Sequence, residues 1–99
     1  MESFKYDKGM KVYTVYDWGM ELSGKWLFNR LGELGCDICT YSYNDDKLDL
    51  YGEYPKDTFI GIKKFFYDNY PYSSLVEPRK YGIRIHFKTK ISFNYNSLV

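Results

Sequence analysis

The stretch from Cys36 to Tyr54 constrains the fold more than any other part of the chain. Residues 36–43 and 47–54 are extended runs rich in tyrosine, isoleucine and leucine, a composition that favours β-strands. Between them stands Asn44-Asp45-Asp46, a polar triplet of turn-forming residues. Pro55 follows the second run and cannot donate a hydrogen bond to a strand ladder. The stretch therefore predicts a β-hairpin.

Periodicity predicts the remaining elements. Residues 10–16 and 81–90 are expected to be strands, the latter because Ile83, Ile85 and Phe87 alternate with polar residues. A helix is expected between residues 18 and 34, capped by Asp17 or Ser23 and ended by Gly35. A second helix is expected from Asp57 or Thr58 to about Asn69, with residues 70–80 as a loop. Residues 4–9 offer a short partner strand, with Asp7-Lys8-Gly9 as its turn.

This order of elements predicts an α+β fold in a single two-layer domain covering residues 1–99. The sequence β-α-β-β-α-β is that of the ferredoxin-like arrangement, in which two helices cover one face of an antiparallel sheet. An extra N-terminal strand can be added to this sheet without changing the layout.

Composition limits the class of protein. The formal net charge is +1, and no run approaches the roughly 20 apolar residues of a membrane span. The N-terminal residues lack the apolar segment of a signal peptide, so we expect a cytoplasmic protein with reduced cysteines. Alanine and glutamine are absent while tyrosine, asparagine and lysine abound. This bias indicates a low-GC genome, such as that of a Gram-positive bacterium or one of its phages.

The sequence offers little for metal, cofactor or redox chemistry. Cys36 and Cys39 form a C-x-x-C, but a structural zinc site needs four ligands and the chain has one histidine, His86. Residues three apart in a strand point to opposite faces, so the two thiols are expected to diverge. A metal shared between two subunits is the alternative. Phosphate-binding, dinucleotide-binding and hydrolase motifs are absent. We expect no metal, no cofactor and no catalytic residues.

Asp17, in the segment VYDW, has two interpretations. It can cap the first helix. Its expected place at the end of the first strand also resembles the position of a carboxylate in nucleases of CRISPR adaptation and related toxins, which share this topology. The resemblance implies a metal-dependent nuclease, whereas capping implies only a local structural role.

Tyrosine is the residue type that most favours an interaction surface. The chain has 12 tyrosines, more than one small core needs, and tyrosine and arginine are enriched at binding hot spots. If Leu48 and Leu50 point inward, then Lys47, Asp49, Tyr51 and Glu53 point outward. Tyr41 and Tyr43 join this face in one hairpin register, and a slip by one residue would turn them to the other face. The candidate partner-binding residues of the open sheet face and of the loop from residue 67 to 72 are Tyr41, Tyr43, Tyr51, Arg84, His86, Lys88, Tyr67, Tyr70 and Tyr72. The alternative is that most tyrosines line the margin of the core, and that His86 is a solvated strand residue or contacts a phosphate.

These features favour a small non-enzymatic binding protein. We expect an inhibitor or regulator that occupies a surface of a protein partner and is able to form a homodimer; a phage-encoded inhibitor directed at a host or defence protein is a special case. The alternative is a nucleic-acid-binding module that uses an aromatic and basic sheet face. Against it, Asp49 and Glu53 would repel phosphate, and the near-zero net charge lacks the usual electrostatic footprint.

Overall fold

The computed structural model describes residues 12–95 of the chain. In chain order the elements are β1 (Tyr13–Tyr16), β2 (Gly19–Ser23), α1 (Gly24–Glu33), β3 (Asp37–Asn44), β4 (Lys47–Glu53), a 3-10 turn (Lys56–Thr58), α2 (Phe59–Asn69), β5 (Ser73–Arg79), β6 (Gly82–Phe87) and β7 (Ile91–Asn94). The partner strand expected at residues 4–9, with its turn, lies outside the described residues.

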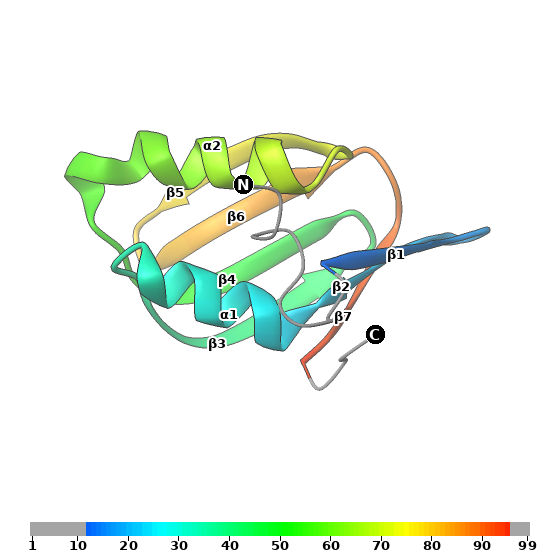
Figure 1. Cartoon of the computed structure of the whole chain (residues 1–99), viewed down its shortest axis with the longest axis horizontal. Coiled ribbons are helices and arrows are strands. Elements are labelled where there is room, and N and C mark those ends of the chain that lie inside the picture. Colours follow the sequence, from blue (N-terminus) through cyan, green and yellow to red (C-terminus); the bar gives the residue numbers. More distant parts are fainter. Residues whose placement is uncertain (1–11, 96–99) are drawn as a thin grey trace.

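The seven strands form two sheets (Figure 1). Four strands pair antiparallel in the order β3-β4-β6-β5, and three pair in the order β1-β2-β7, with β2 and β7 parallel. Both helices lie on one side of the four-stranded sheet (Figure 1). The α+β class with two helices is thus confirmed. The ferredoxin-like layout is not, because the strand before α1 pairs with β1 and β7 in a second sheet instead of entering the first.

The predicted hairpin is confirmed. β3 and β4 pair antiparallel around a tight turn in which Asp45 adopts a left-handed conformation with φ 59°. Aspartate tolerates this conformation better than most residues, because its short polar side chain can bond locally. Leu48 and Leu50 are fully buried and point toward the helices. This burial fixes the register, since a slip by one residue would turn both leucines toward solvent.

The first helix begins at the later of its two predicted starting points. Residues 17 and 18 form the turn between β1 and β2, and the helix begins at Gly24. Met20 and Leu22 fall within the range predicted as helix, but both lie on β2, where they occupy alternate positions and are buried. Ser23 occupies the N-cap position, although its hydroxyl makes no capping hydrogen bond. Gly35 follows the helix with φ 92°, as expected of a residue that ends a helix.

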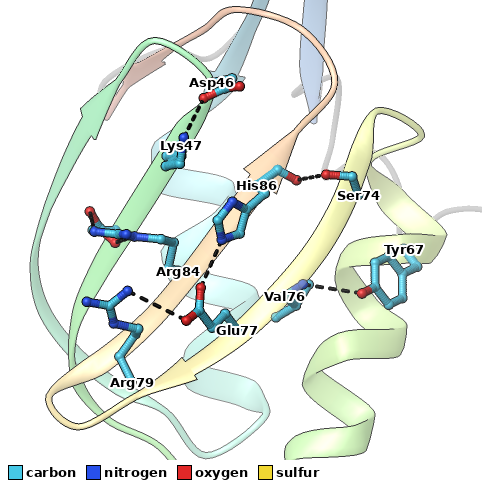
Figure 2. A network of polar contacts seen from close by, with 10 residues as sticks. Asp46, Lys47, Tyr67, Ser74, Val76, Glu77, Arg79, Arg84 and His86 are labelled. Atoms are coloured by element: carbon cyan, nitrogen blue, oxygen red, sulfur yellow. Dashed lines mark hydrogen bonds and ion pairs between the residues drawn. The ribbon is translucent and has the colours of Figure 1, made fainter.

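The prediction of a loop over residues 70–80 is wrong, because β5 occupies most of this segment. β5 is an edge strand, and edge strands tolerate proline since one side of the strand makes no ladder bonds. Pro78 lies on it, and the Val76 amide donates to the hydroxyl of Tyr67, 3.2 Å away on α2 (Figure 2). Proline and this side-chain bond leave the edge poorly suited to pairing with another strand.

Apolar side chains from both sheets and both helices form one continuous core. The fully buried members include Leu27 and Leu31 of α1, Ile62 and Phe66 of α2, Leu48 and Leu50 of β4, Ile83 and Ile85 of β6, and Met20 and Leu22 of β2. Leu34, expected on the inner face of the first helix, is instead exposed beyond its end. Since one core spans both sheets, the described residues form a single packing unit.

Replacing either of two glycines of α1 with alanine is expected to change the stability of the fold in opposite directions. A Cβ at the exposed Gly32 meets no atom within 4 Å, whereas one at Gly24 would come within 2.6 Å of the Phe93 ring. We expect Gly32→Ala to raise the free energy of unfolding by about 0.5–1 kcal/mol, because alanine loses less backbone entropy in a helix. Gly24→Ala should lower it through the clash. Urea titration of both variants tests this, and equal effects would contradict it.

The buried hydroxyl of Tyr70 is expected to lower the stability of the fold. Its side chain is fully buried, its hydroxyl has no hydrogen-bond partner among residues 12–95, and burial raises the pKa of that hydroxyl far above its usual value. We expect Tyr70→Phe to raise the free energy of unfolding by about 1 kcal/mol or more, because it removes an unsatisfied buried group. Tyr67→Phe, which removes the acceptor of the Val76 amide, should lower it. Thermal unfolding of both variants and of the native protein tests these expectations. A Tyr70→Phe variant that is less stable than the native protein would show that the hydroxyl is hydrogen-bonded.

Candidate binding surface

The four-stranded sheet leaves one face uncovered by the helices (Figure 2). In the antiparallel register Lys47 lies opposite His86, Asp49 opposite Arg84, and Tyr51 opposite Gly82. These residues occupy the positions between the buried ones, so they share the face that points away from the helices. We call this the outer face. The outward direction predicted for Lys47, Asp49, Tyr51 and Glu53 agrees with the register.

The cations in the middle of the outer face are already paired. The Arg84 guanidinium donates to both carboxylate oxygens of Asp49, at 2.7 and 3.2 Å. This bidentate bond raises the pKa of Arg84. Lys47 contacts the carboxylate of Asp46 at 3.1 Å. The sheet centre therefore presents few unpaired charges to a partner.

Glu77 connects two further basic groups on β5 and β6 (Figure 2). One of its carboxylate oxygens lies 2.9 Å from His86 Nε2, and the other lies 3.7 Å from Arg79 Nη1. The hydrogen bond from His86 is the main cause of a lowered pKa at Glu77. His86 is thus held by a carboxylate and is not a freely solvated side chain.

The structure separates the predicted tyrosines. Tyr41 and Tyr43 lie opposite Leu50 and Leu48, so both share the helix-facing side of the sheet and not the outer face. Tyr41 packs against Phe93, with ring centroids 4.3 Å apart, and belongs to the margin of the core. Tyr43, near the end of its strand, remains 43% exposed. Of the three tyrosines assigned to the hairpin, Tyr51 alone reaches the outer face.

The segment from residue 67 to 72 is also divided. Tyr70 is fully buried and is inaccessible to a partner in this structure. Tyr67 and Tyr72 are exposed, but the hydroxyl of Tyr67 is engaged with β5. Lys88 is exposed just beyond β6. The nine candidates therefore do not form one surface.

Among residues 12–95, the fold does not bring the cysteines or Asp17 into a group of side chains that could hold a metal ion. Cys36 is buried, which raises the pKa of its thiol, and Cys39 is exposed at an irregularity of β3. Both are free, and residues 12–95 contain no cluster of histidine, cysteine, aspartate and glutamate placed to hold a metal ion. Asp17 lies in the turn between β1 and β2, so it neither caps α1 nor stands at a strand-to-helix junction. The position that the nuclease resemblance required is therefore not found.

One end of the outer face is hollowed. Gly82 lies between Tyr51 and Arg79 in the strand register. Because it is a glycine, it adds no side chain to this row of three residues. A Cβ there would collide with the carbonyl oxygen of Leu50, so glycine is required. The cavity of about 170 Å³ at this point is named the Gly82 hollow, and its polar and aromatic walls are Asp49, Tyr51, Arg79, Lys80, Tyr81 and Arg84. A wider depression beside it shares Tyr51, Lys80 and Tyr81 and extends to Tyr54 and Lys56.

A second exposed aromatic group lies at the tip of the β1–β2 hairpin, which projects from the body of the molecule (Figure 1). The rings of Tyr16 and Trp18 stack at 5.4 Å with an angle of 11° between their planes. Tyr16 also donates to Glu21 at 3.0 Å, a bond that raises the pKa of its hydroxyl. Tyr16 is 44% exposed and Trp18 is 48% exposed. The pair, named here the aromatic tip, was missed because residue 18 onward was expected to be helical.

Comparison with protein-family models, with curated proteins and with solved structures gives no match. Among residues 12–95, neither helix has the length and hydrophobicity to cross a membrane.

The Glu77–His86 bond predicts a pH-dependent contribution to stability. The folded state lowers the pKa of Glu77 below its ordinary 4.5, so the carboxylate stabilises the fold above that pH and this contribution is lost as the pH falls further. We expect the melting temperature of the native protein to exceed that of Glu77→Gln at neutral pH, with a gap that narrows below about pH 4.5. Glu53→Gln is the control, since Glu53 has no ion pair among residues 12–95. A gap independent of pH would contradict the assignment.

Proposed function

We propose that this protein is a small non-enzymatic binding protein that occupies a surface of a protein partner through the aromatic tip. The observation that supports this most directly is the stacked pair of Tyr16 and Trp18 on a projecting hairpin. Tryptophan and tyrosine are the side chains most enriched among residues that dominate binding energy at protein interfaces.

Contacts within the chain hold both side chains of the aromatic tip. Tyr16 is held by its bond to Glu21, whose other carboxylate oxygen accepts from Asn94 at 3.0 Å. Trp18 is held by stacking on Tyr16. A side chain that is already fixed loses little rotamer entropy on association, so more of its contact energy remains as affinity.

Nucleic-acid binding by the outer face has less support. Arg84 is engaged by Asp49, and His86 by Glu77, so neither is available to a phosphate without breaking an existing bond. Tyr41 and Tyr43, which would stack bases, lie on the other side of the sheet.

The proposal extends to the role of the protein in the cell. An exposed aromatic pair on a small domain suits a cytoplasmic inhibitor or regulator, and the residue composition, which indicates a low-GC genome, suits one encoded by a phage of a Gram-positive bacterium and directed at a host or defence protein. The genes that flank the coding sequence test this part, since a GC-rich, non-phage neighbourhood would remove it.

Substitution at the aromatic tip tests the proposal. The native protein, Trp18→Ala and Ile60→Ala are each used for affinity capture from a low-GC Gram-positive lysate, with quantitative mass spectrometry. Ile60, 79% exposed on α2, is a matched apolar control distant in sequence from the tip. We expect one partner protein to be captured by the native chain and by Ile60→Ala. Its affinity for Trp18→Ala should fall about 30-fold or more, the loss of about 2 kcal/mol expected of a hot spot.

Two controls make this result interpretable. Trp18 is exposed, so its replacement should leave the thermal unfolding curve nearly unchanged. If Trp18→Ala folds normally and captures the same protein at the native level, the aromatic tip is not the interface. If the captured material is nuclease-sensitive and its binding weakens steeply with salt, the nucleic-acid alternative replaces the proposal.

A further inference from the structure

We propose that the Gly82 hollow is a binding site for an acidic peptide segment, and that it takes one carboxylate between Arg79 and Lys80. The hollow lies on the outer face of the four-stranded sheet, whereas the aromatic tip belongs to the three-stranded sheet. The proposal therefore does not depend on the function assigned to the tip.

The charge around the hollow is incompletely balanced. Lys80 has no ion pair among residues 12–95, and its ammonium lies 5.3 Å from the centre of the Tyr81 ring. Arg79 is 3.7 Å from Glu77, beyond hydrogen-bond distance. Asp49 is the acidic residue in the wall, and Arg84 already neutralises it. An anion in the hollow would thus meet two cations with unused donors and a third held in place beside them.

The walls suit a peptide side chain. Tyr51 is 41% exposed and Tyr81 is 71% exposed, so both side chains leave aromatic surface for an apolar or aromatic residue next to the carboxylate. The Tyr51 hydroxyl lies 3.2 Å from Ser42 Oγ, which fixes that ring from the neighbouring strand. The volume of about 170 Å³ is below the roughly 300–1,000 Å³ of pockets that enclose whole small molecules, and it suits a single side chain.

The surroundings favour one carboxylate over a polyanion. Glu77 lies on the β5 side of the hollow, and Glu53 lines the depression next to it. A nucleic-acid strand crossing the hollow would carry phosphates past these carboxylates on both sides, whereas a peptide needs only one anionic group. The peptide would bind through side chains, because Pro78 and the Tyr67–Val76 bond obstruct strand addition at β5.

Fluorescence anisotropy with defined probes tests the site on the full chain. The probes are a fluorescein-labelled capped peptide with one glutamate flanked by tyrosines, the same peptide with glutamine in place of that glutamate, and a labelled hexathymidylate. We expect the acidic peptide to bind at least about tenfold more tightly than the glutamine peptide, a difference of about 1.4 kcal/mol. The double variant Arg79→Ala/Lys80→Ala should lose a similar factor, and Tyr81→Ala should weaken binding further.

The double variant Lys88→Ala/Lys90→Ala is the matched control, because it removes the same charge from exposed positions outside the hollow. It should bind the acidic peptide as the native chain does. The proposal is overturned if the native chain binds both peptides equally or neither of them, or if both double variants lose affinity equally. Tighter binding of hexathymidylate than of the acidic peptide also overturns it, in favour of nucleic acid. Circular dichroism confirms that each variant is folded.

Discussion

The tight turn of the β3–β4 hairpin joins the two sheets. The Asp46 carbonyl accepts a hydrogen bond from the Phe87 amide at 2.8 Å, and the Asp45 carbonyl accepts one from the Ile91 amide at 2.7 Å. The first bond holds the end of β6 in the four-stranded sheet, and the second holds the start of β7 in the other. The turn presents both carbonyls because Asp45 adopts a left-handed conformation. One backbone geometry therefore fixes the point where the chain passes from one sheet to the other.

The same hairpin arranges the charges of the outer face. Its register brings Asp49 beside Arg84 on the paired strand, while Glu77 on β5 engages His86. These contacts occupy the charged groups in the centre of the sheet. Surface ion pairs contribute little to stability, but they determine which cations remain available to a ligand. Lys80, which has no ion pair among residues 12–95, and the exposed ring of Tyr81 are thus found at the Gly82 hollow, and the stacked rings of the tip lie on the other sheet.

The sequence located part of these surfaces. Alternation in β4 and β6 placed Tyr51, Arg84 and His86 on one face, and the register agrees. The orientation of Tyr41 and Tyr43 required the pairing of two strands, which alternation within one strand cannot supply. Trp18 was missed because leucines spaced for a helix further along the chain hid the strand before it. Lys80 was missed because it was assigned to a loop, and Tyr81 because it was assigned to the start of a strand, whereas the two residues form the turn between β5 and β6.

The sequence by itself determined the α+β class, the hairpin with its Asn44-Asp45-Asp46 turn, and the second helix. These depend on local chemistry: turn residues, alternating apolar side chains and capping positions. Tertiary structure alone decided that β2 and β7 pair in a separate sheet, that Tyr70 is buried, and that Gly82 opens a hollow among basic and aromatic side chains. Each of these depends on which distant segments come together, and in a core shared by two sheets that choice is made by packing rather than by local propensity.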